Sequence, residues 1–310
     1  MGVGGLVRPE GPDGHAFAAT TPDGSCGFFE HGSRLCTIHR VGGQALLPVT
    51  CQMFPRVVLR DSRGAFISLS HYCPTAAGLL FDMSTPASIV QAPASLVSAS
   101  TLEGLDATDT WAPLLRPGVL MDVDSYGEWE RLAIDRLTAD GLSPWHALDS
   151  LERTTASIVD WCPGIGAGPL SEHVQNAFGP RGVVSDLKLP DGALAKLVRD
   201  AVSSELTAPA PPDDLALRLP AALEAMERDA AAICRWLAAR LFGTWIAYQG
   251  NGLRTIVRYL RAALDVLSLE VARGARDGAI DQPAMLEAVR RSDYLIIHLA
   301  GSQRLATLLS

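Results

Sequence analysis

The chain has 310 residues, of which 48% are hydrophobic and 19% are charged, and its formal net charge is −8 at pH 7. A chain of this length buries roughly three quarters of the surface that its unfolded form exposes. The composition therefore excludes a mainly disordered protein. Nucleic acids and anionic membranes require clustered lysine and arginine, and the basic residues of this chain do not cluster. We therefore expect neither as the main partner.

The longest segment without charge, Met83 to Leu102, contains two prolines and five serines. It is too polar for a transmembrane helix and predicts a loop. No basic segment followed by an apolar run and a cleavage site opens the chain, so we expect a cytoplasmic protein with reduced thiols. Under those conditions its six cysteines are better explained as metal ligands or buried thiols than as disulfides.

The first part of the chain has little regular periodicity. Residues 1–25 are rich in glycine and proline and predict an extended or mobile lead-in. Residues 26–82 form a loop-rich segment with one hairpin, from Arg56–Leu59 and Ala65–Leu69. Such a segment cannot supply its own core and needs a metal or a neighbouring domain to hold one shape. Residues 83–120 are predicted to be connecting loops.

Residues 121–310 show helical periodicity. The expected helices are one capped by Asp124 or Ser125, one from Ser143–Pro144 to Ile158, a short one around Leu194–Val198, a long one from Leu219 to Ala247, an amphipathic one from Leu253 to Val271, and a last one from Asp281 to about Leu299. The predicted fold class is mainly α, with an irregular cysteine-rich metal-binding N-terminal module packed on an α-helical body.

Four cysteines fall in the segment that lacks a core: Cys26, Cys36, Cys51 and Cys73. Thiolates bind zinc and iron–sulfur clusters tightly, and four ligands suffice for either. The separations of nine, fourteen and twenty-one residues are not a zinc-ribbon signature. Spacing alone therefore leaves two interpretations open, a shared metal site and four buried thiols.

The sequence around these cysteines carries four ordered elements. They are a cysteine followed by an apolar pair, a Leu-Cys-x-Ile-His step ending at His39, a Cys-x-x-Phe-Pro-Arg step ending at Arg56, and a Ser-Leu-x-x-x-Cys-Pro-x-Ala-Ala step ending at Ala77. In these elements the chain resembles the flagellin lysine-N-methylase family. That family belongs to a wider group of cysteine-cluster proteins that chelate zinc or iron. The helical remainder resembles the family more weakly.

The resemblance implies an enzyme that transfers a methyl group from S-adenosylmethionine to a lysine amine of a flagellin-like protein. It also implies an iron–sulfur cluster or zinc held by the four cysteines. Family members usually begin with a further group of cysteines, and residues 1–25 contain none. Either the start of this sequence lies too late, or this member keeps only half of the ligand set.

Basic residues near the cysteines could offset the negative charge of a thiolate centre. We expect Arg56 to lie near the centre and Arg34 and Arg40 to be solvated. His39 and His71 are expected to be hydrogen-bonding neighbours of the centre, with metal ligation as the alternative. Cys162 and Cys234, which fall in the helical part, are expected to be core thiols.

Two further patterns have a structural and a functional interpretation. The Gly164-x-Gly166-x-Gly168 run could cradle S-adenosylmethionine, but the preceding residues are helical in pattern and no acidic residue follows at the expected distance. We interpret it as a loop. Asp122, Asp124, Glu128 and Glu130 form an acidic patch around a helix start, where negative charge is favourable. The alternative is attraction of a lysine-bearing substrate.

Three functional hypotheses follow. The first is the lysine N-methyltransferase, whose donor-binding and catalytic residues the sequence does not identify. The second is a non-catalytic metal-binding protein, structural or redox-sensing. The third is a related enzyme that acts on a small amine or amino acid. The absence of a Ser/His/Asp ordering or a G-x-S-x-G motif gives hydrolase chemistry no support.

Overall fold

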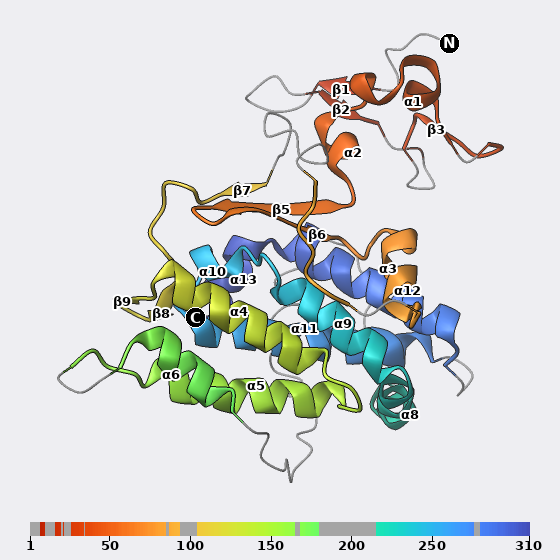
Figure 1. The fold of residues 1–310 in the computed structure, drawn as a ribbon. Helices are drawn as coiled ribbons and strands as arrows, with labels where there is room; N and C mark the ends of the chain where they lie inside the picture. Colours follow the sequence, from red (N-terminus) through yellow and green to blue (C-terminus); the bar gives the residue numbers. More distant parts are fainter. Residues whose placement is uncertain are drawn as a thin grey trace. The chain divides into compact units, whose positions relative to one another are not determined.

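A computed structural model describes residues 7–9, 16–19, 21, 26–33, 35–84, 87–93, 104–164, 168–179, 215–275 and 280–310 (Figure 1). The chain forms two compact units, residues 1–54 and residues 55–310. Among the described helices, none has the length and apolar character needed to cross a membrane. The boundary at residue 54 falls inside the segment that the sequence suggests as one module, 26–82.

The N-terminal unit consists of short elements. They are β1 (Val7–Pro9), β2 (Ala16–Ala18), β3 (Phe29–Glu30), β4 (Leu35–Cys36), α1 (Thr37–Gly42), the 3-10 helix η2 (Gln44–Leu46) and α2 (Val49–Met53). β1 pairs antiparallel with β2, and β3 pairs antiparallel with β4. Among the side chains that the structure describes in this unit, only Ala19 and Met53 are buried.

The second unit begins with a small sheet. β5 (Arg56–Asp61) pairs antiparallel with β6 (Gly64–Leu69) and parallel with β7 (Leu105–Asp106). β8 (Leu114–Arg116) and β9 (Val119–Leu120) form a separate hairpin. The predicted hairpin over residues 56–69 is therefore confirmed. Val58 and Leu59 of the central strand are buried, and the indole of Trp245 donates to the Val58 carbonyl at 2.9 Å.

Helices make up most of what the structure describes in the remainder of this unit, so the predicted mainly α class is confirmed (Figure 1). They are α3 (Pro74–Phe81), α4 (Val123–Leu137), α5 (Pro144–Val159), α6 (Leu170–Ala177), α8 (Leu215–Arg228), α9 (Ala230–Leu241), α10 (Ile246–Gln249), α11 (Leu253–Gly274), α12 (Gln282–Asp293), the π-helical segment η4 (Tyr294–Ala300) and α13 (Ser302–Leu309). The predicted short helix around 194–198 lies outside the described residues.

The core of the second unit surrounds α11, which packs against α5, α8, α9, α10, α12 and α13. Its apolar residues are buried almost all round the helix, as expected for an interior helix. Trp129, Trp145 and Trp236 are the largest side chains that are fully buried. Each buried side chain of this size contributes about 1.5–3 kcal/mol or more by leaving water.

The predicted single helix from Leu219 to Ala247 is wrong, because the chain breaks at Asp229 and again at Gly243. Gly243 has a φ of 60°, and a Cβ atom there would lie 3.0 Å from that of Phe66. Only glycine adopts this left-handed conformation without strain, so the helix ends there. The sequence also misplaced the cap of α4, since Asp122 accepts from the Ser125 amide at 2.8 Å.

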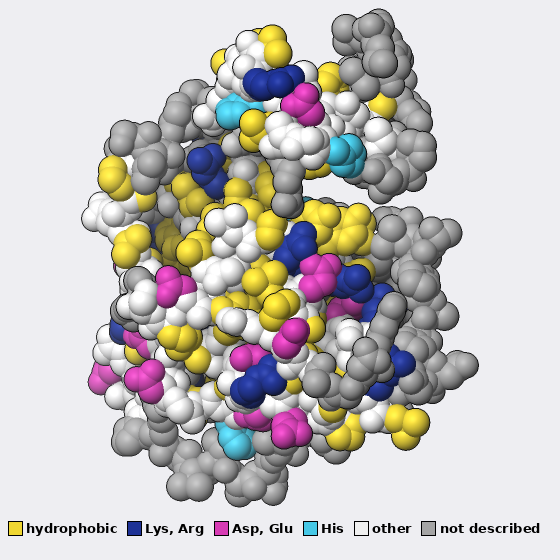
Figure 2. All heavy atoms as spheres, turned by 90° about the vertical axis from the view of Figure 1, so that its right-hand side faces the viewer, with side chains coloured by type: hydrophobic (Ala, Val, Ile, Leu, Met, Phe, Trp, Pro, Cys, Tyr) yellow, Lys and Arg dark blue, Asp and Glu magenta, His cyan; other side chains and the backbone are white. Residues whose placement is uncertain are grey.

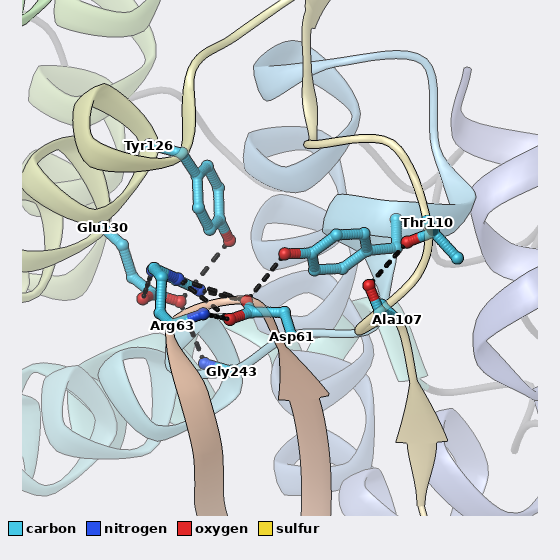
Figure 3. A network of polar contacts seen from close by, with 8 residues as sticks. Asp61, Arg63, Ala107, Thr110, Tyr126, Glu130 and Gly243 are labelled. Carbon is cyan, nitrogen blue, oxygen red and sulfur yellow. Dashed lines mark hydrogen bonds and ion pairs between the residues drawn. The ribbon is translucent and has the colours of Figure 1, made fainter.

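Buried charges join the β5–β6 turn to the helices (Figure 3). Arg63, in the turn, contacts Asp61 at 2.7 Å and Glu130 of α4 at 3.1 Å. Asp61 also accepts from the Tyr248 hydroxyl at 2.6 Å, and Glu130 accepts from the Gly243 amide at 3.0 Å. Glu130, which the sequence assigned to an acidic surface patch, is therefore a buried partner of Arg63, 3% exposed.

Burial acts to raise the pKa of both carboxylates of this cluster, but their partners offset that effect to different extents. Burial alone would raise the pKa of Asp61, but hydrogen bonds from Arg63 and Tyr248 lower it below its usual value. Burial raises the pKa of Glu130 above its usual value, and the Arg63 charge and the Gly243 amide offset this only in part. Both carboxylates therefore depend on one guanidinium group for most of their compensation.

We predict that Arg63→Met lowers the free energy of unfolding by about 3–5 kcal/mol, because it leaves two buried carboxylates without their cation. Arg131→Met is the matched control. Arg131 also contacts two carboxylates, Glu128 and Asp135, but its side chain is 51% exposed. Its loss should cost less than about 1 kcal/mol. Urea unfolding of both variants measures the difference, and equal losses would contradict the prediction.

Candidate metal-binding site

Cys26 and Cys36 lie at the same end of the β3–β4 hairpin. Phe29 pairs with Cys36 across the hairpin, and its amide donates to the Cys26 carbonyl at 2.8 Å. Cys36 is also the N-cap residue of α1. Cys26 is exposed and Cys36 is half-buried. The hairpin and the start of α1 therefore hold two of the predicted ligands, Cys26 and Cys36, near each other.

Cys51, on α2, lies within electrostatic reach of both. The pKa of the Cys51 thiol is raised by partial burial and then by the charges of Cys26 and Cys36. Like charges act in this way only when they are close, so the three thiols share one neighbourhood of the N-terminal unit. In the described part of the chain, no three His, Cys, Asp or Glu side chains already stand in a metal-coordinating arrangement.

Cys73, the fourth predicted ligand, belongs to the second unit. It is half-buried and is the N-cap residue of α3, with Pro74 at the first helical position. Pro74 cannot donate a hydrogen bond and suits this position, where the amide would lack a helical partner. The local sequence thus sets the backbone of Cys73 at a helix start, as it does for Cys36.

The predicted neighbours of the cysteines have different environments. His39 is exposed on α1, and Arg40 contacts Glu30 at 3.2 Å, both partly exposed. Arg56 is exposed at the start of β5, in the second unit. His71 is buried, and burial followed by the Arg240 charge lowers its pKa to about 4. A neutral His71 is thus part of the interior of the second unit. Arg34 lies outside the described residues.

The two remaining thiols differ from each other. Cys234 is 3% exposed, and burial raises its pKa to about 12, so the predicted core thiol is confirmed. The same prediction for Cys162 is wrong, because this thiol is exposed. It follows the end of α5, where Arg116 donates to the Val159 and Trp161 carbonyls at 2.6 Å. The centre of the neighbouring glycine run, 165–167, lies outside the described residues.

Sequence reasoning missed the residues that hold the turn before Cys73. Asp293 and Arg240 are both buried and lie 3.6 Å apart. Each falls on the apolar stripe of its helix, Asp293 with Met285 and Val289, and Arg240 with Trp236. A charged residue at a core position of a helical pattern is the signal that could have identified them.

The surface of the helical unit carries both signs of charge. On the face that Figure 2 shows, basic and acidic side chains are interspersed. Several ion pairs of this unit lie within one helix, such as Arg290 with Glu287 of α12. Among the described side chains on this face, neither sign of charge forms a separate surface. In searches against family models, curated proteins and solved structures, the chain has no match.

The proximity of the three thiols predicts a change in reactivity. In reduced, metal-free protein, replacing both Cys26 and Cys36 with serine should lower the pKa of Cys51, because two like charges are removed. At a pH below that pKa, more thiolate is then present and alkylation of Cys51 becomes faster. Mass spectrometry of iodoacetamide-treated protein over a range of pH measures this.

Cys162→Ser is the control for this experiment, since Cys162 is exposed and belongs to the second unit. It should leave the pH profile of Cys51 alkylation unchanged. An unchanged profile in the Cys26/Cys36 variant as well would mean that the three thiols are not neighbours in the metal-free protein.

Proposed function

We propose that the N-terminal unit is a metal-binding module with Cys26, Cys36 and Cys51 as ligands. The observation that carries this proposal is the raised pKa of Cys51, to which the charges of Cys26 and Cys36 contribute after partial burial, in a unit whose described side chains are almost all exposed or half-buried. Thiolates repel one another in the absence of a cation, and a bound metal converts that repulsion into attraction.

The exposed apolar residues of the unit support the need for a metal. Its described surface carries Phe29, Leu35, Val41, Leu46, Val49 and Phe54, and Val41 is 81% exposed. Hydrophobic side chains appear among the charged ones on its surface in Figure 2. A unit of this size that leaves its large side chains exposed gains little from the hydrophobic effect. Metal coordination supplies folding free energy directly and takes the place of that missing core.

Zinc and an iron–sulfur cluster both suit cysteine ligands. Three thiolates leave one position of a tetrahedral centre for a fourth ligand. A fourth thiolate closes a structural zinc site or completes the ligand set of a four-iron cluster. A centre that keeps the position open binds water or substrate there instead, as catalytic zinc does.

Metal content tests the module directly. We expect protein purified without oxygen to contain either iron with equimolar sulfide and broad visible absorption, or one zinc without colour. Cys51→Ser should lose the metal and expose residues 1–54 to faster proteolysis, because the unit loses its main stabilisation. Cys162→Ser, which alters an exposed thiol elsewhere, should keep both. Folded wild-type protein without metal would refute the module.

We further propose, on the resemblance of residues 26–77 to the flagellin methylases, that the protein transfers a methyl group from S-adenosylmethionine to a lysine amine. The methyl group leaves the sulfonium sulfur of the donor and bonds to the ε-nitrogen, which must first lose its proton. An apolar site or a general base lowers the free energy of that proton loss. A flagellin-like protein is the proposed substrate, and a small amine or amino acid is the alternative.

Donor binding separates the enzyme from a non-catalytic metal protein. In metal-loaded protein, S-adenosylmethionine at 100 times its dissociation constant should add about 2.7 kcal/mol to the free energy of unfolding. Labelled donor with flagellin or a total cell lysate should then place label on lysine, and Cys51→Ser should abolish it. Label on a small amine identifies the alternative substrate. Metal-loaded protein that binds no donor is a structural or redox-sensing metal protein instead.

A further inference from the structure

One tryptophan of this chain lies almost wholly in solvent. The chain has six tryptophans, of which three are fully buried and two are half-buried. The sixth, Trp111, is 81% exposed and lies in the loop between β7 and β8 of the second unit. Tryptophan side chains are large, and on average they are highly buried. The exposed indole is therefore a large apolar surface that is available for contact with another molecule.

The loop that carries Trp111 starts from a fixed backbone. The Ala107 amide donates to the Arg60 carbonyl of β5 at 2.7 Å. Thr110 donates to the Ala107 carbonyl twice, through its amide at 3.2 Å and through its hydroxyl at 2.9 Å, and Figure 3 shows the second of these bonds. A loop that is held in this way presents its aromatic side chain at a low entropic cost of binding.

A second exposed apolar side chain belongs to the strand next to this loop. The Met121 amide donates to the Pro113 carbonyl at 2.9 Å, so the end of the loop runs beside the end of β9. Leu120 of β9 is 47% exposed. We refer to Trp111 and Leu120, together with the loop over residues 107–113, as the Trp111 surface.

The exposed charges next to the Trp111 surface are acidic. Residues 104–124 include four aspartates and one arginine. Asp109 is exposed two residues before Trp111, and Asp124 is exposed in the first turn of α4, which follows β9. The one arginine, Arg116, donates to two carbonyls at the end of α5, each at 2.6 Å. Its charge is thus directed at α5.

Basic residues of two neighbouring elements are paired with aspartates. Arg60 of β5 contacts Asp106 at 2.5 Å. Arg254, in the first turn of α11, which packs against β8, contacts Asp160 at 3.6 Å. These pairs offset one basic charge each, so the carboxylates of the Trp111 surface leave it negatively charged.

We propose that the Trp111 surface is a docking site for a cationic segment of a partner protein, one that carries lysine or arginine next to an apolar side chain. The carboxylates attract such a segment, and the face of the indole binds its cation. Tryptophan is also among the residues that contribute most to protein–protein binding. The same carboxylates repel anionic lipid headgroups, so a protein suits this surface better than a membrane. The inference rests neither on metal binding nor on methyl transfer.

The test follows the indole of Trp111 in the full-length protein. Labelling with nitrogen-15 tryptophan gives one indole N–H signal for each of the six side chains, and Trp111→Phe identifies the signal of Trp111 by its loss. The probe is a short synthetic peptide of lysine and leucine, and its counterpart has glutamate in place of every lysine. We expect the lysine peptide to shift the Trp111 signal and to leave those of the three fully buried tryptophans in place. The glutamate peptide should shift none.

Four variants then measure the contributions to affinity for the lysine peptide. Trp111→Ala should weaken binding about tenfold or more. Asp109→Asn combined with Asp124→Asn should weaken it about three-fold and reduce its dependence on salt. Leu217→Ala removes an apolar side chain that is 83% exposed on α8, and Asp140→Asn removes an exposed charge beyond the far end of α4. These two controls should each change the affinity by less than about two-fold.

A Trp111 signal that does not respond to the lysine peptide, or that responds equally to both peptides, overturns the inference. Equal weakening by Trp111→Ala and Leu217→Ala also overturns it. A signal that responds to phosphatidylcholine vesicles and not to the peptide identifies a membrane anchor instead. A signal that shifts with protein concentration alone identifies contact between copies of the chain, and it contradicts the inference as well. Metal content and methyl transfer are measured separately, so failure of the proposed function leaves this result unaffected.

Discussion

A carboxylate in the interior of the helical unit needs donors around it, and Asp293, on α12, contacts donors from two other segments. It joins α9 through Trp236 and Arg240, α12 through its own position, and the turn after β6 through the His71 amide. Glu130 plays the corresponding role on the other side of β6, where it joins α4 to the β5–β6 turn and to the break after α9. The small sheet is thus fastened to the helices at both ends of β6 by buried charge.

Apolar periodicity was sufficient to predict most of this helical unit. The stripe from Leu253 to Val271 became α11, the Ser143–Pro144 start became α5, and the alternation around residues 56–69 became the β5–β6 hairpin. These elements are stabilised by burial of one face. The spacing of apolar residues in the sequence indicates which face is buried, so such elements can be predicted. The break at Gly243 was missed because its cause, a close approach to Phe66 and a bond to Glu130, comes from segments far away in the sequence.

Charged residues were predicted less well for the same physical reason. Glu130 reads as part of an acidic surface patch when only its neighbours Asp122, Asp124 and Glu128 are considered. Its burial depends on Arg63, 67 residues earlier in the chain. Asp293 and Arg240 give only a weak signal in the sequence, which is a charge within an apolar stripe. Both contact the turn before Cys73, and that turn is far away from them in the sequence. The sequence indicates four cysteines as possible ligands. The structure indicates which three of them, Cys26, Cys36 and Cys51, lie near one another.

The two units obtain their stability from different sources, and this difference bears on function. The helical unit buries three tryptophans and a continuous apolar core, so the hydrophobic effect is its main source of stability. In the N-terminal unit, the described side chains bury almost nothing, and the free energy of a metal–thiolate centre is of the same order as the stability of a whole small domain. On the proposed metal-binding function, loss of the metal would unfold the small unit and leave the large one folded. A protein built in this way can report the presence of a metal, or its oxidation state, as the folding of one part of the chain while the other part keeps its structure.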